Sequence, residues 1–261
     1  MFNNELWQKP SGGAAGGGFY SYQIPNSCRV NWSTGVWPSL VVPHMSRAMS
    51  TPTNADKATI SFWLKRSVEG LSGCTGFYNA ATSNGYGQIG FQSDDTIRVL
   101  MAPNSGAAAQ LDLRTTAVYR DYSACYHLVL AYDSTQASAG DRAKLYINGE
   151  QVVSWAYSTN SASQNADTGV FKSGNATLVG ARHSSSSQNF WDGNIAHVHI
   201  ISGQSHPPSV FGETDSTTNE WKPKLSPTGI TYDSENSAFL KFENASALGT
   251  DSSGQTNTFT V

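Results

Sequence analysis

Acidic side chains two residues apart are the first candidates for chemistry in this chain. Hydrolysis of a glycosidic bond needs two carboxyl groups that flank the bond, and residues i and i+2 of a strand face the same groove. Glu213 and Asp215 have this spacing, but the next glutamate is Glu220, and residues 212–219 are rich in loop-forming types. We therefore predict a surface loop at this position and expect that the chain is not an enzyme.

His197 and His199 are the candidates for metal binding, because neutral imidazoles are good ligands for zinc-like ions. Their spacing places both on one face of a strand. A metal site also needs a third or fourth ligand, and the sequence identifies none. We adopt the alternative interpretation, which is two histidines on a half-exposed sheet face, and we predict no metal and no cofactor. The sequence also contains no G-x-S-x-G elbow, P-loop or dinucleotide fingerprint.

Aromatic residues in turn-rich stretches are the most suggestive feature of the sequence. The chain has 7 Trp and 11 Tyr, which is more than a core requires. Sugar rings present apolar C–H faces that stack on aromatic planes, although Tyr, Trp, Asn and Ser also suit general protein contacts, and any single aromatic can belong to the core. Five residues are predicted to form a glycan-binding rim: Trp155, Tyr157, Asn189, Trp191 and Asp192.

The composition excludes several classes of protein. Only 13% of the residues are charged and the formal net charge is -3, whereas nucleic-acid binding needs clustered Lys and Arg. The apolar runs are strand-sized, far below the roughly 18 residues of a membrane span, and the N-terminus lacks the pattern of a signal peptide. The three cysteines, Cys28, Cys74 and Cys125, cannot all pair with one another and indicate thiols in a reducing cytoplasm. We expect no nucleic acid among the partners and no membrane span.

Short strands separated by turns must position these residues. The 24 Gly and 10 Pro, and the absence of a sustained 3.6-residue apolar period, indicate an all-β chain. The clearest hairpin runs through residues 143–153, because Asn148-Gly149 is the preferred dipeptide of a type I′ turn. Such a chain folds as a β-sandwich or a β-barrel. The other predicted strands are residues 59–66, 88–91, 96–100, 126–132, 176–180 and 193–201, and the long loops are residues 133–142, 154–175 and 183–190.

Two pairs of segments resemble laminin-G-like, concanavalin A-like jelly rolls. Residues 126–134 followed by 144–150 are similar to the family's aromatic-His-Val strand and its Leu-Tyr-Val-Asp/Asn-Gly hairpin. Residues 178–180 followed by 190–198 are similar to its Ile-Gly and Phe-x-Gly-x-Ile-x-x-Val pair. The resemblance implies an all-β, two-sheet antiparallel jelly-roll sandwich of the concanavalin A-like lectin/glucanase type.

The same resemblance raises the question of calcium, which laminin-G-like domains often bind at the rim of the sandwich. Loop aspartates and carbonyl oxygens are the usual ligands. Asp133, Asp141 and Asp192 lie in suitable loops but form no recognisable ligand set, so the prediction names no cofactor and leaves calcium as the open alternative.

A further set of segments resembles virion structural proteins of tailed bacteriophages, marine and cyanobacterial ones especially. The resemblance implies a non-enzymatic virion surface protein that is made in the host cytoplasm, contacts other capsid or tail proteins and can form homo-oligomers. A tail fibre or receptor-binding adhesin would bind host surface polysaccharide. The alternatives are a capsid decoration or head-fibre protein without glycan binding and, less favoured, a polysaccharide-degrading enzyme. The segments are residues 24–30, 62–67, 201–204, 211–215, 221–224 and 248–254.

Three regions are expected along the chain. Residues 1–22 form a Gly-rich arm, and its Phe2, Leu6 and Trp7 would anchor the protein to the virion. Residues 23–202 form the laminin-G-like jelly roll. Residues 203–261 form a C-terminal extension, in which residues 238–243 are predicted to return as a strand near the first strand, around residues 29–40.

Overall fold

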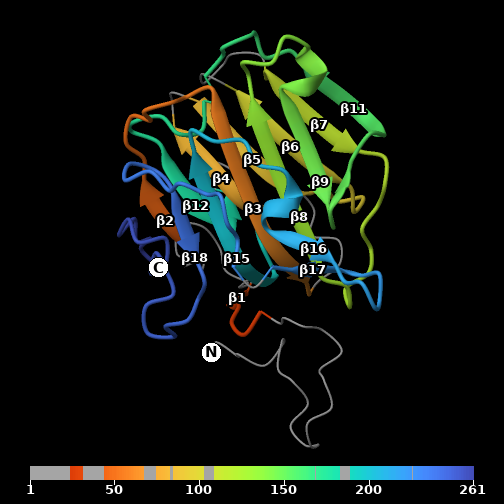
Figure 1. Cartoon of the computed structure of the whole chain (residues 1–261), viewed down its shortest axis with the longest axis vertical. Coiled ribbons are helices and arrows are strands. Elements are labelled where there is room, and N and C mark those ends of the chain that lie inside the picture. The colour runs from red at the N-terminus through yellow and green to blue at the C-terminus, as the bar shows by residue number, and fades with distance from the viewer. Residues whose placement is uncertain are drawn as a thin grey trace, which may run out of the picture.

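Two seven-stranded antiparallel sheets lie face to face in the computed structural model (Figure 1). The structure describes residues 24–31, 44–67, 75–82, 85–102, 109–167, 169–182, 189–224 and 226–261. This architecture confirms the predicted all-β, two-sheet antiparallel sandwich.

The strand order defines a front sheet and a back sheet. The front sheet runs β1 (Cys28–Val30), β15 (Gly193–Ser202), β3 (Lys57–Arg66), β8 (Tyr126–Asp133), β9 (Ala143–Ile147) and β10 (Glu150–Gln151), and β18 (Ala238–Leu240) also pairs with β15. The back sheet runs β11 (Trp155–Asn160), β7 (Leu111–Thr115), β6 (Ile97–Ala102), β5 (Gly85–Phe91), β4 (Thr75–Thr82), β12 (Ala176–Val179) and β2 (Met45–Ala48).

Smaller elements decorate the sandwich. They are the strand pairs β13 (Ala181–Arg182) with β14 (Asn189–Phe190) and β16 (Gly212–Thr214) with β17 (Trp221–Pro223), and the 3-10 helices η2 (Ala139–Asp141) and η3 (Pro208–Val210). Among the described residues, no helix has the length and apolar character needed to cross a membrane.

Alternate residues of the facing strands form the core between the sheets, because successive side chains of a strand point to opposite faces. The inward side chains are almost fully buried. They include Ile60, Phe62 and Leu64 of β3 in the front sheet, and Ile97, Val99 and Met101 of β6 in the back sheet.

The predicted hairpin at residues 143–153 is confirmed. Asn148 and Gly149 have φ angles of 49° and 85°, as a turn with two left-handed residues requires. The backbone N–H of His127 donates to Asn148 Oδ1 at 2.7 Å, so the turn is also tied to the neighbouring strand. The ring of Trp221 lies against Gly149, where a Cβ atom would be 2.5 Å from Cε3 of the indole.

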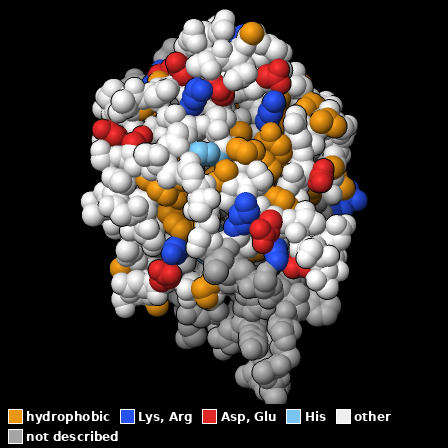
Figure 2. All heavy atoms as spheres, viewed as in Figure 1, with side chains coloured by type: hydrophobic (Ala, Val, Ile, Leu, Met, Phe, Trp, Pro, Cys, Tyr) orange, Lys and Arg blue, Asp and Glu red, His pale blue; other side chains and the backbone are white. Residues whose placement is uncertain are grey.

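Residues after β15 cover the outer face of the front sheet over its central strands, so β15, β3 and β8 are buried on both sides. Phe211 packs with Val129, and Trp221 packs with Trp63. All ten residues of β15 are buried as a result. On the surface seen in Figure 2, which has the viewpoint of Figure 1, Lys and Arg side chains are interspersed with Asp and Glu.

The end of the chain takes part in both sheets. β18 pairs with Val198–Ile200 of β15, along the strand that β1 joins at Gly193–Ile195. Among the described residues its partner is therefore β15, the strand that also pairs with β1, and residues 32–40 lie outside the described residues. On the back sheet, Thr260 exchanges two backbone hydrogen bonds of 2.8 Å with Ser46 of β2. The outer edge of β2 is thus occupied by the C-terminal residues.

Candidate functional site

A β-bulge in β11 decides which way its aromatic side chains point. Trp155 pairs with Thr115 of β7, but Tyr157 pairs with the next residue, Arg114, so Ala156 has no partner in the register. Cross-strand partners lie on the same face, and an extra residue moves the remainder of the strand to the other face. Trp155 therefore faces the front sheet with Thr115, whereas Tyr157 stands on the outer face and is 54% exposed.

The same register turns Ser158 and Asn160 inward. Ser158 pairs with Leu113 and Asn160 with Leu111, and both leucines are core residues of β7. β11 was expected to be part of a long loop at residues 154–175, and this expectation is wrong. The strand places one indole, one hydroxyl and one amide on a single inward face.

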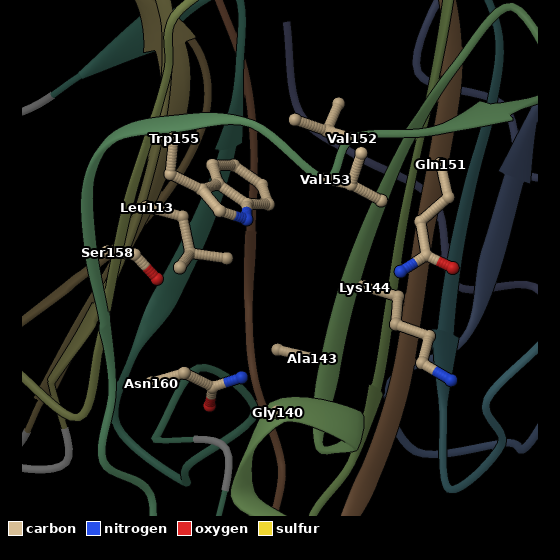
Figure 3. A pocket seen from close by; sticks show the side chains of 10 residues that line it. All are labelled: Leu113, Gly140, Ala143, Lys144, Gln151, Val152, Val153, Trp155, Ser158 and Asn160. Atoms are coloured by element: carbon tan, nitrogen blue, oxygen red, sulfur yellow. The ribbon is translucent and has the colours of Figure 1, made fainter.

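A pocket of about 260 Å³ lies at this edge of the sandwich. We call it the edge pocket. β7 and β11 of the back sheet form one wall, and β9 and β10 of the front sheet form the other (Figure 3). The segment that crosses from β10 to β11 closes one end, and η2 closes the opposite end. The lining residues are Leu113, Gly140, Ala143, Lys144, Gln151, Val152, Val153, Trp155, Ser158 and Asn160.

Several polar groups of the edge pocket have no partner among the described residues. The Oδ1 atom of Asn160 is buried without a hydrogen bond. Figure 3 shows the amide of Gln151 on the facing wall and the indole nitrogen of Trp155 directed into the pocket. Asn160 Oδ1 is itself too deeply buried to meet a ligand, but Figure 3 shows the amide nitrogen of Asn160 on the side of the pocket. A ligand in the pocket would therefore meet N–H donors of Asn160 and Trp155 and both groups of the Gln151 amide.

The edge pocket carries little net charge. Lys144 is the single charged residue in its lining, and its Nζ lies 3.0 Å from the carboxylate of Asp141. The remaining lining combines amides, a hydroxyl and the indole with apolar Leu113 and the valines Val152 and Val153. Such a lining suits a neutral ligand that has both an apolar face and several hydroxyl groups.

The predicted rim is not a single surface, and Trp191 is the clearest error in it. Trp191 is 1% exposed and stacks on Phe91, with ring centroids 5.8 Å apart. A Cβ added to Gly193 would lie 2.9 Å from the Trp191 ring, so glycine at this position makes room for the indole. Trp191 is a core residue and cannot contact a glycan at the surface.

The other predicted rim residues are also dispersed. The Asp192 carboxylate is nearly buried and bonds to Arg29 at 2.6 Å, so it joins the segments around β1 and β15. The side chain of Asn189 lies outside the described residues. Trp155 alone lines the edge pocket, and Tyr157 lies on the opposite face of its strand.

Glu213 and Asp215 belong to a β-hairpin and not to the predicted surface loop. Both carboxylates pair with Lys222 of β17, at 3.6 Å and 2.8 Å. The hydrogen bond from Lys222, together with the backbone N–H groups of Thr218 and Thr217, lowers the pKa of Asp215 to about 2. A general acid needs a pKa close to the working pH, so Asp215 is not suited to that role, and its ion pair with Lys222 ties the two strands of the hairpin together.

His197 and His199 are not on a half-exposed face, as predicted, but are buried beneath the residues that come after β15. A second irregularity, between Ala196 and His199, gives His197 a φ of 45°. The His199 ring stacks on Phe239 at 3.9 Å, and Nδ1 is 2.6 Å from the hydroxyl of Tyr232. Among the described residues no cluster of three or more His, Cys, Asp or Glu could hold a metal ion.

A buried serine–histidine pair, Ser61 and His127, was missed by the sequence analysis. The indole N–H of Trp221 donates to Nδ1 of His127 at 2.9 Å, and Nε2 lies 2.9 Å from Ser61 Oγ. An indole can only donate, so Nδ1 is unprotonated and Nε2–H donates to the serine. Burial, with a smaller effect of His197, lowers the pKa of His127 to about 3. This histidine therefore cannot accept a proton from Ser61, and the pair is structural.

The aspartates considered for calcium are each engaged elsewhere. Asp133 pairs with Lys57 at 3.2 Å and accepts hydrogen bonds from Thr135, while Asp141 and Asp192 pair with Lys144 and Arg29. The predicted anchor residues Phe2, Leu6 and Trp7 lie outside the described residues.

Comparison with solved structures finds similar folds at low identity. The native heptameric SAP-like pentraxin from Limulus polyphemus is 14% identical, with a TM-score of 0.44 over 66% of this chain and 75% of that one. The enzymatically active domain of bacteriophage CBA120 tailspike protein 2 is 10% identical, with a TM-score of 0.46 over 70% of this chain but 26% of the tailspike. The CBM40 of Ruminococcus gnavus IT-sialidase, bound to alpha2,3 sialyllactose, is 16% identical, with a TM-score of 0.38 over 54% and 73%.

No curated protein matches this sequence. A family model does match it: the model described as concanavalin A-like lectin/glucanases superfamily covers residues 44–210. This range runs from just before β2 to η3 and includes every strand that lines the edge pocket. The lectin-like jelly roll and the family model agree, and the chain belongs to the concanavalin A-like lectin/glucanases superfamily.

Proposed function

We propose that this chain is a non-enzymatic glycan-binding protein and that the edge pocket is its binding site. The main support for the proposal is the set of polar side-chain groups that line the edge pocket next to the Trp155 indole. The amides of Gln151 and Asn160, the hydroxyl of Ser158 and the N–H of Trp155 all belong to the lining, and these side-chain groups form no ion pair or side-chain hydrogen bond with another described residue. Alternating hydroxyls and an apolar ring face are what a sugar offers to such a lining.

The carboxylates support a binding role over a catalytic one. None of the ten lining residues of the edge pocket is Asp or Glu, whereas glycoside hydrolysis needs two carboxyl groups at the scissile bond. Glu213 and Asp215 share Lys222 as their ion-pair partner and lie outside the lining of the edge pocket.

A virion surface is the setting that we propose for this binding. It rests on the segments that resemble structural proteins of tailed phages, such as residues 24–30 and 248–254. As a receptor-binding adhesin, the protein would act in many copies, because one small pocket binds weakly and linked copies gain strength through avidity.

Binding of the full chain to an array of bacterial surface glycans tests the glycan-binding role. We expect selective binding that falls about tenfold or more for Trp155→Ala and for Asn160→Ala, a loss of at least about 1.4 kcal/mol. Tyr157→Ala is the matched control, since it removes an aromatic from the same strand but the opposite face. An array without binding, or equal losses in all three variants, would contradict the proposal.

Immunogold electron microscopy of intact particles, with antibody to this chain, tests the virion setting. Label at the tail tip or fibres is the expected result for an adhesin. Label spread over the head would favour a decoration protein. Unlabelled particles would refute the virion setting, but they would not affect the proposal that the chain binds glycans.

A further inference from the structure

We infer that the edge pocket accepts a single neutral pyranose at the end of a glycan chain, and not an internal stretch of polysaccharide. This inference rests on the proposed glycan-binding function and specifies its ligand. It is drawn from the shape of the pocket, its volume and the balance of charge in its lining.

The edge pocket is closed at both ends along the strands. The crossing from Gln151 to Trp155 bounds it at one end, and Gly140 of η2 bounds it at the other (Figure 3). A polysaccharide that continues on both sides of its bound unit needs a groove with two exits. A pit of this form admits the tip of a chain and leaves the rest in solvent.

The volume agrees with one ring. At about 260 Å³, the pocket is below the range of about 300–1,000 Å³ that encloses drug-sized ligands. Its floor includes the core residues Leu113 and Ala143, which are almost fully buried and would meet an apolar ring face. The polar groups of Gln151 and Asn160 stand on opposite walls, where they reach hydroxyls on the two sides of a ring.

The charges favour a neutral sugar over an acidic one. The cation of Lys144 is matched by Asp141 at 3.0 Å, so the lining leaves no uncompensated charge for a carboxylate. A carboxylate in the pocket would have to displace Asp141 or lose part of its hydration. Val153 at the rim is 79% exposed, and this leaves an apolar contact for the first atoms outside the ring.

The test uses the full chain bound to an array glycan and competes it with methyl pyranosides. The probes are the methyl glycosides of glucose, galactose, mannose and N-acetylglucosamine, with methyl glucuronide as the acidic probe. We expect one neutral probe to displace the glycan completely, at a concentration within about tenfold of that of a trisaccharide with the same end. Enzymatic removal of the terminal residue should abolish binding.

Ser158→Tyr supplies a variant that fills the edge pocket from an exposed position without entering the core. It should weaken binding at least about 30-fold, as expected when a central contact is blocked, while Tyr157→Ala should leave it unchanged. Circular dichroism and the unfolding midpoint confirm that both variants fold.

Two groups of results would overturn the inference while leaving the glycan-binding function intact. One is binding that survives removal of the terminal residue or is displaced only by oligosaccharides. The other is displacement by the acidic probe alone, or full binding by Ser158→Tyr. Failure of the chain to bind any array glycan would instead refute the proposed function itself.

Discussion

At the scale of single residues, Trp191 and Tyr157 differ in burial, although the sequence analysis assigned both to a surface rim. Trp191 is 1% exposed and stacked on Phe91, whereas Tyr157 is 54% exposed. We predict that Trp191→Ala lowers the free energy of unfolding by about 3–5 kcal/mol, as for other large core aromatics. Tyr157→Ala should change it by no more than about 0.5 kcal/mol. Urea unfolding followed by circular dichroism measures both, and comparable losses would contradict the assignment of Trp191 to the core.

Two glycines with the same φ angle allow the cost of a left-handed backbone to be measured separately from the cost of a steric clash. Gly149 and Gly174 both have φ of 85°, but a Cβ on Gly149 would clash with Trp221, and one on Gly174 would meet nothing within 4 Å. Gly174→Ala should therefore cost about 1–2 kcal/mol from the left-handed backbone alone. Gly149→Ala should cost at least about 1 kcal/mol more, because the indole must move. If both variants lose the same free energy of unfolding in denaturant, the Trp221 ring does not pack closely against Gly149.

At the scale of elements, the sequence predicts strongly patterned strands and misses short ones with polar or turn-like residues. The hairpin around Asn148-Gly149 and the long strand at residues 126–132 were predicted, since a turn dipeptide and a run of apolar and aromatic residues are local signals. β11 was not predicted, because its sequence WAYSTN is only half-buried and its bulge breaks the alternation on which the prediction depends.

The candidate site was predicted only in part for the same reason. Trp155 was singled out, but its neighbours in the edge pocket come from strands far apart in the sequence, such as Leu113 and Lys144. Trp155 and Tyr157 were both assigned to the predicted rim, and the unpaired Ala156 places them on opposite faces of β11. Trp191 carries a signal that could have been used, since Gly193 nearby indicates close packing.

The buried histidines predict a loss of stability in mild acid. Burial and neighbouring cations lower the pKa of His127 to about 3 and of His197 to about 4, and hold that of His199 well below its ordinary value. Unfolded histidines titrate near pH 6.5, so between about pH 4 and 6.5 the unfolded chain binds more protons. Stability is complete above this window and falls as the pH drops through it, by about 1.4 kcal/mol per pH unit for each histidine.

Denaturant unfolding at pH 7 and pH 5 measures this effect. His197→Gln should reduce the pH dependence by the share of one histidine. Asp94, Asp133 and Asp215, whose pKa values are lowered, add to the loss of stability only below about pH 5, outside the measured range. A free energy of unfolding that is constant between pH 5 and 7 would contradict the burial of the three rings.

At the scale of the whole molecule, residues 203–261 are integrated with the sandwich. Phe211 and Trp221 cover one face of the front sheet, and β18 extends its hydrogen bonding. We predict one cooperative thermal transition for the full chain, with equal calorimetric and van't Hoff enthalpies. An early, separate transition of the C-terminal residues would contradict this integration, and limited proteolysis at the temperature between the two transitions would then release them.

The position of Phe259 has a consequence for how the protein is made. This side chain is 2% exposed in the core, and its neighbour Thr260 pairs with Ser46 at the edge of β2. Until these late residues have left the ribosome, neither the core nor this edge can be completed. Folding then depends on contacts that span more than two hundred residues, and such long-range pairing is slow. Until it forms, the edge of β2 is unpaired and can pair with other chains. The sandwich is therefore completed only after synthesis of these residues, and the β2 edge stays unpaired until then.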